Sequence, residues 1–250
     1  MELIRLKNIS FAYGRHPALA GINHVFHAGT MTAILGPNGS GKTTLLKTII
    51  GLLKPDTGVV TIHNQNLHQK SPNDIARLMA YVPQTEHNIF AITVFDTILT
   101  GRNPYLQWKP GKADIEIVSG IIEELNLQQV AFKNINELSG GQKQKVFVAR
   151  ALAQQTDTLL LDEPAANLDI RHANEVMELL QTLAAKGYTV IQSAHHINLA
   201  LKYFSDFVMM KEGRILSSGG IEIFDEALME KIFDVKCQYK KDGDLRYFVF

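Results

Sequence analysis

Several features are scarce in this 250-residue sequence, and each absence excludes a class of protein. The single cysteine, Cys237, allows no intramolecular disulfide and no cysteine metal cluster, which suits a reducing compartment. Twenty-five basic and 25 acidic residues give zero net charge without a basic run. Nucleic acid is therefore disfavoured as the principal partner.

Long apolar runs are missing as well. No run approaches the roughly 20 residues that cross a bilayer, and Met1 to Arg5 lack the basic-then-apolar layout of a secretory signal. We therefore expect that a partner must hold the protein at any membrane where it works. The hydrophobic content of 46% is enough for a packed core, in one large domain or two small ones.

The stretch Gly36-Pro37-Asn38-Gly39-Ser40-Gly41-Lys42-Thr43, followed by Thr44, fits the phosphate-binding pattern G-x-x-x-x-G-K-[ST]. An apolar strand pattern at 31–35 precedes it, and a helical pattern at 42–53 follows. Such a turn aims backbone N–H groups and a helix N-terminus at one point, where Lys42 reaches the phosphates and Thr43 holds Mg²⁺. The alternative is a glycine-rich turn that caps an ordinary helix. Because every fixed position and both flanks fit, the sequence predicts a nucleoside triphosphate site.

Strand and helix patterns alternate around this loop. We expect strands at 3–13, 22–26, 31–35, 59–62, 79–82, 158–161, 188–193, 207–210 and 214–216. We expect helices at 42–53, from 71, at 94–101 with Gly101 as its end, at 114–125, from 140 through 153, at 174–186 and at 223–233. A closing hairpin would turn at 241–243 into a last strand at 245–250. The alternation predicts an α/β fold with a parallel sheet and helical crossovers.

Changes of pattern along the chain predict its organisation. Residues 1–84 and 156–220 would form a P-loop core with a β-rich N-terminal part. Residues 85–155 read as a mainly helical insertion, and residues 221–250 as a small C-terminal extension. The whole chain would be one nucleotide-binding domain.

Charged side chains follow two of the predicted strands. Asp162 and Glu163 come directly after the strand at 158–161, where a P-loop enzyme holds Mg²⁺ and activates water; a pair of acids in a solvated loop is the alternative. His195 follows the strand at 188–193, although a lone histidine there is more often structural. All three would lie beside the phosphate loop at the carboxyl ends of parallel strands, where open α/β sheets bind ligands. This convergence favours function, with Asp162 on the metal and Glu163 as general base.

The string Leu138-Ser139-Gly140-Gly141-Gln142 precedes a helical pattern. Ser139 and Gln142 have the spacing of a capping box. The two glycines open backbone N–H groups at a helix N-terminus, which makes a second anion site. With this string, the sequence resembles the nucleotide-binding subunit of an ATP-binding cassette (ABC) transporter over nearly its whole length, and the string is that family's signature.

The resemblance implies roles for further residues. Tyr13 stands where an aromatic ring stacks on adenine, although a strand residue packing beside Phe11 also fits. Gln84 stands where a glutamine contacts Mg²⁺ and senses the membrane partner, and 167–169 stands at the D-loop. The implied nucleotide-binding set is Tyr13, residues 36–44, Ser139, Gly140, Gly141, Gln142 and Asp169. The implied metal ligands are Thr43, Gln84 and Asp162, and the implied catalytic residues are Lys42, Gln84, Glu163 and His195.

The resemblance also implies partners. In this family the signature of one subunit faces the phosphate loop of another, which implies a homodimer enclosing two ATP molecules with Mg²⁺. Permease subunits would hold it at the cytoplasmic face of the cell membrane, and a substrate-binding protein would act indirectly. Segments 93–105 and 194–200 resemble importers of ferric siderophores, haem and cobalamin, although 101–104 also fits a plain helix stop and turn.

Departures from the family pattern and two rival functions stay open. Ala165-Ala166 in the D-loop, Lys143 and Lys145 after the signature, and His196 after His195 differ from common family residues. None touches the phosphate loop, Asp162, Glu163 or His195, so the expectation of hydrolysis stands, whereas the D-loop alanines and His196 are expected to tune the coupling between subunits. One rival is a soluble cassette ATPase of iron–sulfur cluster assembly. The other, a nucleic-acid or ribosome-acting cassette protein, usually has two cassettes or a long coiled-coil insertion, and the sequence shows neither.

Overall fold

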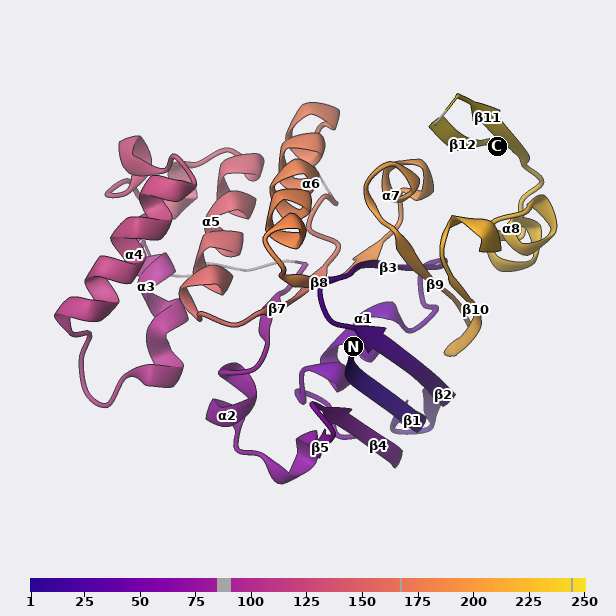
Figure 1. Cartoon of the computed structure of the whole chain (residues 1–250), viewed down its shortest axis with the longest axis horizontal. Coiled ribbons are helices and arrows are strands. Elements are labelled where there is room, and N and C mark those ends of the chain that lie inside the picture. The colour runs from indigo at the N-terminus through magenta and orange to yellow at the C-terminus, as the bar shows by residue number, and fades with distance from the viewer. Residues whose placement is uncertain (85–90, 167, 244) are drawn as a thin grey trace.

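The computed structural model describes the chain apart from residues 85–90, 167 and 244. A six-stranded sheet in the order β10-β9-β3-β8-β7-β6 forms its centre (Figure 1). Its strands are β3 (Met31–Leu35), β6 (Ala80–Val82), β7 (Thr158–Asp162), β8 (Thr189–Ala194), β9 (Asp206–Lys211) and β10 (Arg214–Gly219). Neighbours are parallel except β9 and β10, which are antiparallel. The predicted α/β fold with a parallel sheet is therefore confirmed.

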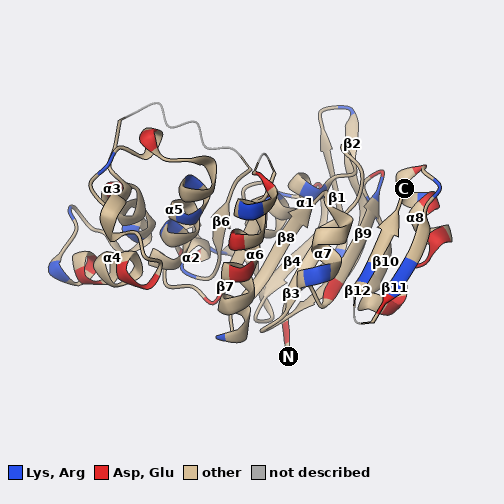
Figure 2. Cartoon of the chain, turned by 90° about the horizontal axis from the view of Figure 1, so that it is seen from above, with Lys and Arg blue, Asp and Glu red and all other residues tan. Residues whose placement is uncertain are grey.

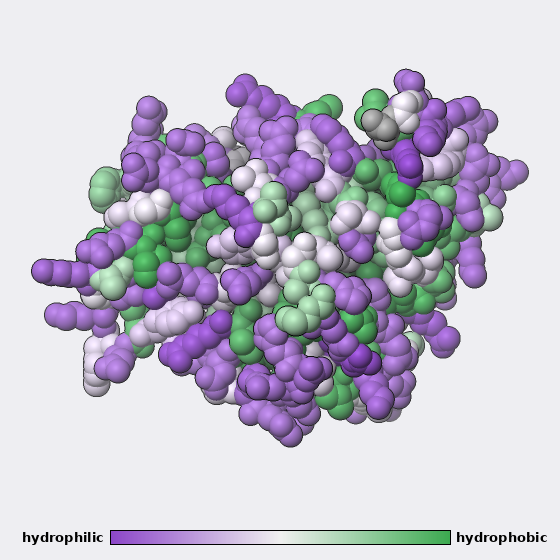
Figure 3. Space-filling model, viewed as in Figure 1, coloured by the Kyte–Doolittle hydropathy of each residue, from purple (hydrophilic) through white to green (hydrophobic). Residues whose placement is uncertain are grey.

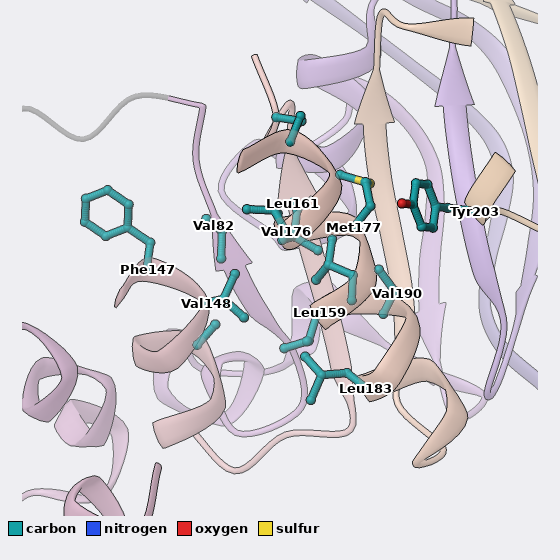
Figure 4. Close-up of a cluster of buried hydrophobic side chains, with 14 of the residues drawn as sticks. Val82, Phe147, Val148, Leu159, Leu161, Val176, Met177, Leu183, Val190 and Tyr203 are labelled. Carbon is teal, nitrogen blue, oxygen red and sulfur yellow. The ribbon is translucent and has the colours of Figure 1, made fainter. Parts of the chain in front are cut away.

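The central strands are buried on both faces, which explains their continuous apolar runs. Along β7, Leu159 and Leu161 pack on the side of α5 (Gly140–Ala153) and α6 (Ile170–Ala185), as Figure 4 shows for α6 with Val176 and Leu183. Leu160, between them, packs on the opposite side with α1 (Lys42–Ile49). Because successive side chains of a strand point to opposite faces, β7 contributes to two hydrophobic clusters, one on each face of the sheet.

A second, antiparallel sheet of order β2-β1-β4-β5 covers α1. It contains β1 (Glu2–Tyr13), β2 (His16–His27), β4 (Thr57–Ile62) and β5 (Gln65–Asn66). We expected the second strand to begin at residue 22. It begins six residues earlier, because the chain reverses at Gly14, whose φ of 61° suits a tight hairpin turn, and β2 then pairs with β1 from Tyr13 onward.

Helices gather at the end of the molecule beyond β6 and β7 (Figures 1 and 2). They are α3 (Val94–Leu99), α4 (Lys112–Glu124), α5, and short 3₁₀ turns at Thr100–Tyr105, Gln128–Val130 and Ile135–Glu137. The helix α2 (Pro72–Ala76) lies apart from them, and its Ile75 packs in the cluster of α1 and the antiparallel sheet. Within the expected insertion at 85–155, the regular elements of the described residues are helices and 3₁₀ turns joined by loops, apart from one bridge between Thr93 and Asn134. Its first six residues lie outside the described part.

The α-helix α3 ends at Leu99, two residues before the expected end at Gly101, although Gly101 does not turn the chain away. The chain continues from α3 into the 3₁₀ turn at Thr100–Tyr105 without leaving helical conformation. Gly101 is needed for packing instead, because a Cβ there would lie 2.1 Å from the carbonyl oxygen of Arg150. The glycine marks a close helix contact rather than a stop signal.

The remaining elements are α7 (Ile197–Tyr203), α8 (Glu226–Phe233), a 3₁₀ turn at Ile221–Ile223, and the hairpin of β11 (Gln238–Asp242) and β12 (Leu245–Val249). The helix α6 begins at Ile170, four residues before the predicted start, because Asp169 caps it by accepting the His172 N–H. Likewise α8 begins at Glu226 and not at 223, because Asp225 accepts the Leu228 N–H. Both caps are short-range features that apolar periodicity alone does not show.

Polar residues cover most of the face in Figure 3, and acidic and basic residues are interspersed along the chain in Figure 2. This distribution agrees with the zero net charge of the sequence. Among the described residues, no helix has the length and apolar character to span a bilayer.

Candidate functional site

The phosphate loop connects the carboxyl end of β3 to α1. Two of its glycines are required by close packing. A Cβ on Gly36 would lie 2.2 Å from the carbonyl oxygen of Met210, and one on Gly41, whose φ is 100°, would lie 2.6 Å from that of Ala18. Contacts with β9 and β2 therefore fix the backbone conformation of the loop. In this conformation the N–H groups of the loop lie at the N-terminus of α1, where an anion can bind.

Lys42 folds back over this loop. Its ammonium group donates hydrogen bonds to the carbonyl oxygens of Gly36 (2.9 Å) and Pro37 (3.1 Å) and lies 3.9 Å from Glu163 Oε1. Burial lowers the pKa of Lys42, while the charges of Glu163 and Asp162 oppose the shift. The buried ammonium group of Lys42, held by two carbonyl oxygens of the loop, is placed where it can bind an anion.

Ser40 provides an independent observation that an anion fits the loop. Its hydroxyl oxygen is buried and has no hydrogen-bond partner. A buried polar atom left unpaired costs about 1–3 kcal/mol, so such atoms are expected to have a partner in the functional state. A phosphate oxygen in the loop would supply the missing acceptor.

Asp162 is buried at the carboxyl end of β7 and collects three hydroxyl groups. Its Oδ1 accepts from Thr43 Oγ1 at 3.0 Å and from Ser193 Oγ at 2.6 Å, and its Oδ2 accepts from the Tyr81 hydroxyl at 3.3 Å. Burial and the adjacent carboxylate raise the pKa of Tyr81. The carboxylate is thereby fixed next to the phosphate loop, with the hydroxyl of Thr43 at its side.

Glu163 is buried at the turn after β7 in the left-handed conformation, with φ of 51°. Its Oε2 accepts a hydrogen bond from Gln84 Nε2 at 2.9 Å and contacts Nε2 of His195. A non-glycine residue in this conformation costs about 1–3 kcal/mol and persists where surrounding contacts hold it. Here the contacts bring Lys42, Gln84 and His195 to one carboxylate from three separate segments.

An open cavity of about 580 Å³ lies over these groups. Its lining consists of Tyr13, His16, Pro17, Ala18, residues 38–44, Gln84, Glu163 and His195. Tyr13 is 49% exposed at the cavity edge, and its ring meets Phe11 edge-to-face at 4.9 Å. Both interpretations of Tyr13 therefore fit its position, since it packs beside Phe11 and still offers a ring face to a ligand.

The serine–glycine string lies apart from this cavity. Ser139 caps α5 in the predicted capping box: its hydroxyl accepts the Gln142 N–H at 3.3 Å, and its own N–H donates to Gln142 Oε1 at 3.2 Å. None of residues 139–142 is among the described residues that line the phosphate cavity. Asp169 is exposed, also outside the cavity, and caps α6; its neighbour Asn167 lies outside the described residues.

Two side chains at this site escaped the sequence interpretation. Ser193 accepts the N–H of Glu163 at 2.9 Å while it donates to Asp162, so it joins the ends of β7 and β8. The available signal was a hydroxyl side chain at the carboxyl end of the predicted strand, two residues before His195. Tyr81 was noted only as a strand residue, and its hydroxyl reaches Asp162 through tertiary contacts alone.

The oxygen donors present are compatible with Mg²⁺. Thr43 Oγ1 and Asp162 Oδ1 lie together, and Gln84 lies across the cavity on Glu163. No group of three or more His, Cys, Asp or Glu residues in the described part of the chain forms a metal cluster. Hard oxygen ligands in small number suit Mg²⁺, which keeps waters and substrate phosphates in its coordination shell.

Comparisons with known proteins agree with this geometry. The family model described as ABC transporter matches residues 19–166. An uncharacterized ABC transporter ATP-binding protein of Methanocaldococcus jannaschii is 38% identical over 94% of this chain and 92% of its own length. The petrobactin import ATP-binding protein FpuD of Bacillus anthracis is 34% identical over 96% and 90%. A solved structure of a proposed metal-chelate type ABC transporter, facing inward, has a TM-score of 0.86 and 27% identity over 99% and 96% of the two chains.

Proposed function

The chain belongs to the ABC transporter family, as an ATP-binding subunit whose ATPase activity is coupled to transport, and from this premise we propose a specific role. It hydrolyses ATP as a homodimer that encloses two ATP molecules and drives the uptake of a metal chelate of the iron–siderophore, haem or cobalamin type. Permease subunits hold it as a peripheral protein at the cytoplasmic face of the membrane, and a substrate-binding protein delivers the cargo.

The observation that carries this proposal is the convergence of Lys42, Gln84 and His195 on the buried carboxylate of Glu163 within the phosphate cavity. A carboxylate held by an amide and an imidazole beside a phosphate-binding loop is suited to accept a proton from an attacking water. The second observation is that the signature string lies outside the cavity of its own chain. A second copy would supply it.

Each group has a stated part in hydrolysis. On binding, Lys42 exchanges its bonds to the carbonyl oxygens of Gly36 and Pro37 for bonds to the β- and γ-phosphates. Glu163 orients the attacking water and takes its proton, while His195 lies against the same carboxylate and reaches the γ-phosphate. Mg²⁺, held by Thr43, Asp162 and Gln84, would neutralise phosphate charge when bound.

The remaining nucleotide contacts follow from the position of each residue. Tyr13 stacks on the adenine from the cavity edge, and residues 36–44 cradle the phosphates with their backbone N–H groups, except Pro37, which has none. Ser139, Gly140, Gly141 and Gln142 of the second copy close the site, with Asp169 at the contact between the copies. In this scheme residues 1–84 and 156–220 act as the nucleotide core, 85–155 as the helical subdomain and 221–250 as an extension.

The import role draws support from the relatives. The Bacillus anthracis protein is named for petrobactin import, and the structural neighbour is of metal-chelate type. A soluble cassette ATPase of iron–sulfur cluster assembly is not favoured by either description. Co-purification separates the two: permease subunits should be recovered with this chain from detergent-solubilised membranes, and recovery of soluble assembly proteins alone would refute the import role.

A mixing experiment tests the homodimer. Lys42→Ala lacks the phosphate-loop cation, and Ser139→Ala lacks the signature hydroxyl, so each homodimer has two defective sites. An equal mixture contains heterodimers with one complete site, and ATPase activity should exceed the sum of the separate variants. Activity that merely equals this sum contradicts a shared site.

A growth experiment tests the transport role. Deletion of the gene should abolish growth on ferric chelates as the only iron source. A plasmid copy of the gene should restore growth, whereas the Glu163→Gln copy should not. Equal growth with both copies would show that ATP hydrolysis by this chain does not drive the uptake.

A further inference from the structure

We propose that Asn198 is a positioning residue for hydrolysis, which fixes α7, and through it His195, against the C-terminal hairpin of β11 and β12. The proposal rests on the role proposed above for His195. It gives the C-terminal extension a function, since the hairpin becomes the support of one side of the ATP site.

The side chain of Asn198 pairs with both backbone groups of a single residue. Its Nδ2 donates to the carbonyl oxygen of Phe248 at 2.9 Å, and its Oδ1 accepts the N–H of Phe248 at 2.8 Å. The amide thus binds β12 as a neighbouring strand would. Two simultaneous bonds to one residue fix both the distance and the rotation of α7 relative to β12.

Phe248 cannot shift easily under this amide. Its side chain is only 2% exposed and lies 4.9 Å from the ring of Tyr239 and 6.1 Å from that of Phe224. The backbone N–H of Tyr239 in turn donates to Glu226 Oε1 of α8 at 2.9 Å. The hairpin is therefore packed on α8 and on α7 together.

The helix α7 also has a fixed contact on its other side. Asn174 Oδ1 of α6 accepts from the Tyr203 hydroxyl at 2.8 Å and from Lys202 Nζ at 3.1 Å. Figure 1 shows α7 between α6 and the hairpin. Because α7 has seven residues and its N-cap, His196, makes no side-chain cap bond, its placement depends on these tertiary contacts.

His195 lies three residues before Asn198, in the link between β8 and α7. Behind this link is a small cavity of about 20 Å³, lined in part by Glu163, Gln192, His195 and Leu199. The side-chain oxygen of Gln192 is buried there without a partner. Because packing behind the link is incomplete, we expect the position of His195 to depend on α7 as well as on its contact with Glu163. Among the described residues of α7 that make a side-chain hydrogen bond, Asn198 is the nearest to His195 in sequence.

The experiment measures steady-state ATP hydrolysis by full-length Asn198→Ala. We expect kcat to fall about five- to twentyfold with an unchanged KM for ATP, because a loosened α7 misplaces His195 while the phosphate loop is intact. Asn198→Asp keeps the acceptor for the Phe248 N–H but places a carboxylate oxygen against the Phe248 carbonyl oxygen, so its kcat should fall at least as far as that of Asn198→Ala. Tyr247→Ala, an exposed neighbour of Phe248, is the matched control and should leave kcat unchanged.

A double variant separates positioning from general stability. If Asn198 acts through His195, Asn198→Ala should cause no further loss of kcat in a His195→Ala background. An unchanged kcat in Asn198→Ala, the same loss in Tyr247→Ala, or an additive loss in the double variant would each overturn the proposal. A wild-type chain without ATPase activity, or a fully active His195→Ala, would instead refute the proposed function on which it rests.

Discussion

The imidazole ring of His172 occupies the space that a side chain at Gly141 would need. A methyl group on Gly141 would lie 2.4 Å from Cδ2 and 2.8 Å from Cβ of His172. The same histidine binds Asp169, with its N–H on Oδ1 and its Nδ1 on Oδ2, both at 2.8 Å. The second glycine of the signature is thus required by packing, and its contact with His172 joins the start of α5 to the start of α6.

This contact predicts that Gly141→Ala destabilises the fold. The clash involves the Cβ of His172, which cannot rotate away, so we expect a loss of about 1–3 kcal/mol and a fall in Tm of about 2–4 °C per kcal/mol. Gly140→Ala is the control, because its methyl group would meet only the terminal Cδ2 of Leu168 at 3.2 Å. Thermal denaturation of both variants checks this, and equal Tm values would contradict it.

Glu163→Gln should lower ATP turnover without weakening ATP binding. The amide keeps the size of the side chain but cannot accept the proton of water, which removes a factor of about 10²–10⁴, or roughly 3–5 kcal/mol of barrier. Single-turnover hydrolysis and nucleotide titration measure the two effects separately. Turnover near the wild-type rate would show that Glu163 is not the general base.

Arg102→Met should unfold the chain at a lower urea concentration. Arg102 is 5% exposed, pairs with Asp114 at 2.9 Å, donates to the carbonyl oxygen of Ala153, and lies over the Tyr105 ring at 4.2 Å. Methionine keeps the apolar stem but removes the donor to the carbonyl oxygen of the buried Ala153, and a buried acceptor left unpaired costs about 1–3 kcal/mol.

The control for this prediction is Arg171→Met. Its guanidinium is 84% exposed in the pair with Glu175, and exposed pairs contribute about 0–1 kcal/mol. Its urea midpoint should stay close to that of the wild type. Equal losses of stability in the two variants would contradict the prediction that the buried position of Arg102 makes its contacts more stabilising.

The lowered pKa of His24 predicts that the protein loses stability in weak acid. Burial, together with the charge of His27, lowers the pKa of His24 to about 4, and Asp206 opposes the shift. Between pH 6.5 and about 4 the unfolded chain binds a proton that the folded chain excludes. The neutral state of His24 therefore contributes at most about 3 kcal/mol to the free energy of unfolding. This contribution is fully present above pH 6.5 and is lost as the pH falls towards 4.

His24→Phe keeps the ring that meets Phe26 edge-to-face and removes the titration. Its free energy of unfolding should fall less between pH 7 and pH 4.5 than that of the wild type, as measured by urea denaturation. His63→Asn changes an exposed histidine and should retain the wild-type slope. A slope for His24→Phe equal to the wild-type slope would rule out His24 as the source.

Much of the fold followed from local sequence patterns. The apolar runs at Met31–Leu35 and Thr158–Asp162 are central strands, because only strands buried on both faces need such runs. The cap of α5 at Ser139 was also predicted, since capping depends on residues three apart. The start assigned to α6 was four residues late, because the cap at Asp169 decides it. The role of Gly101 in packing against Arg150 was not predicted either, because it depends on a tertiary contact.

The sequence by itself determined the family, the α/β fold and the phosphate loop, because these depend on residue types at fixed short spacings. Tertiary structure decided how the site is assembled. Lys42, Gln84 and His195 meet at Glu163 only because β3, β6, β7 and β8 end at one edge of the sheet. The pairing of Asn198 with Phe248 is likewise absent from any local pattern. Contacts between residues far apart in sequence form only once the core packs, so no short motif specifies them.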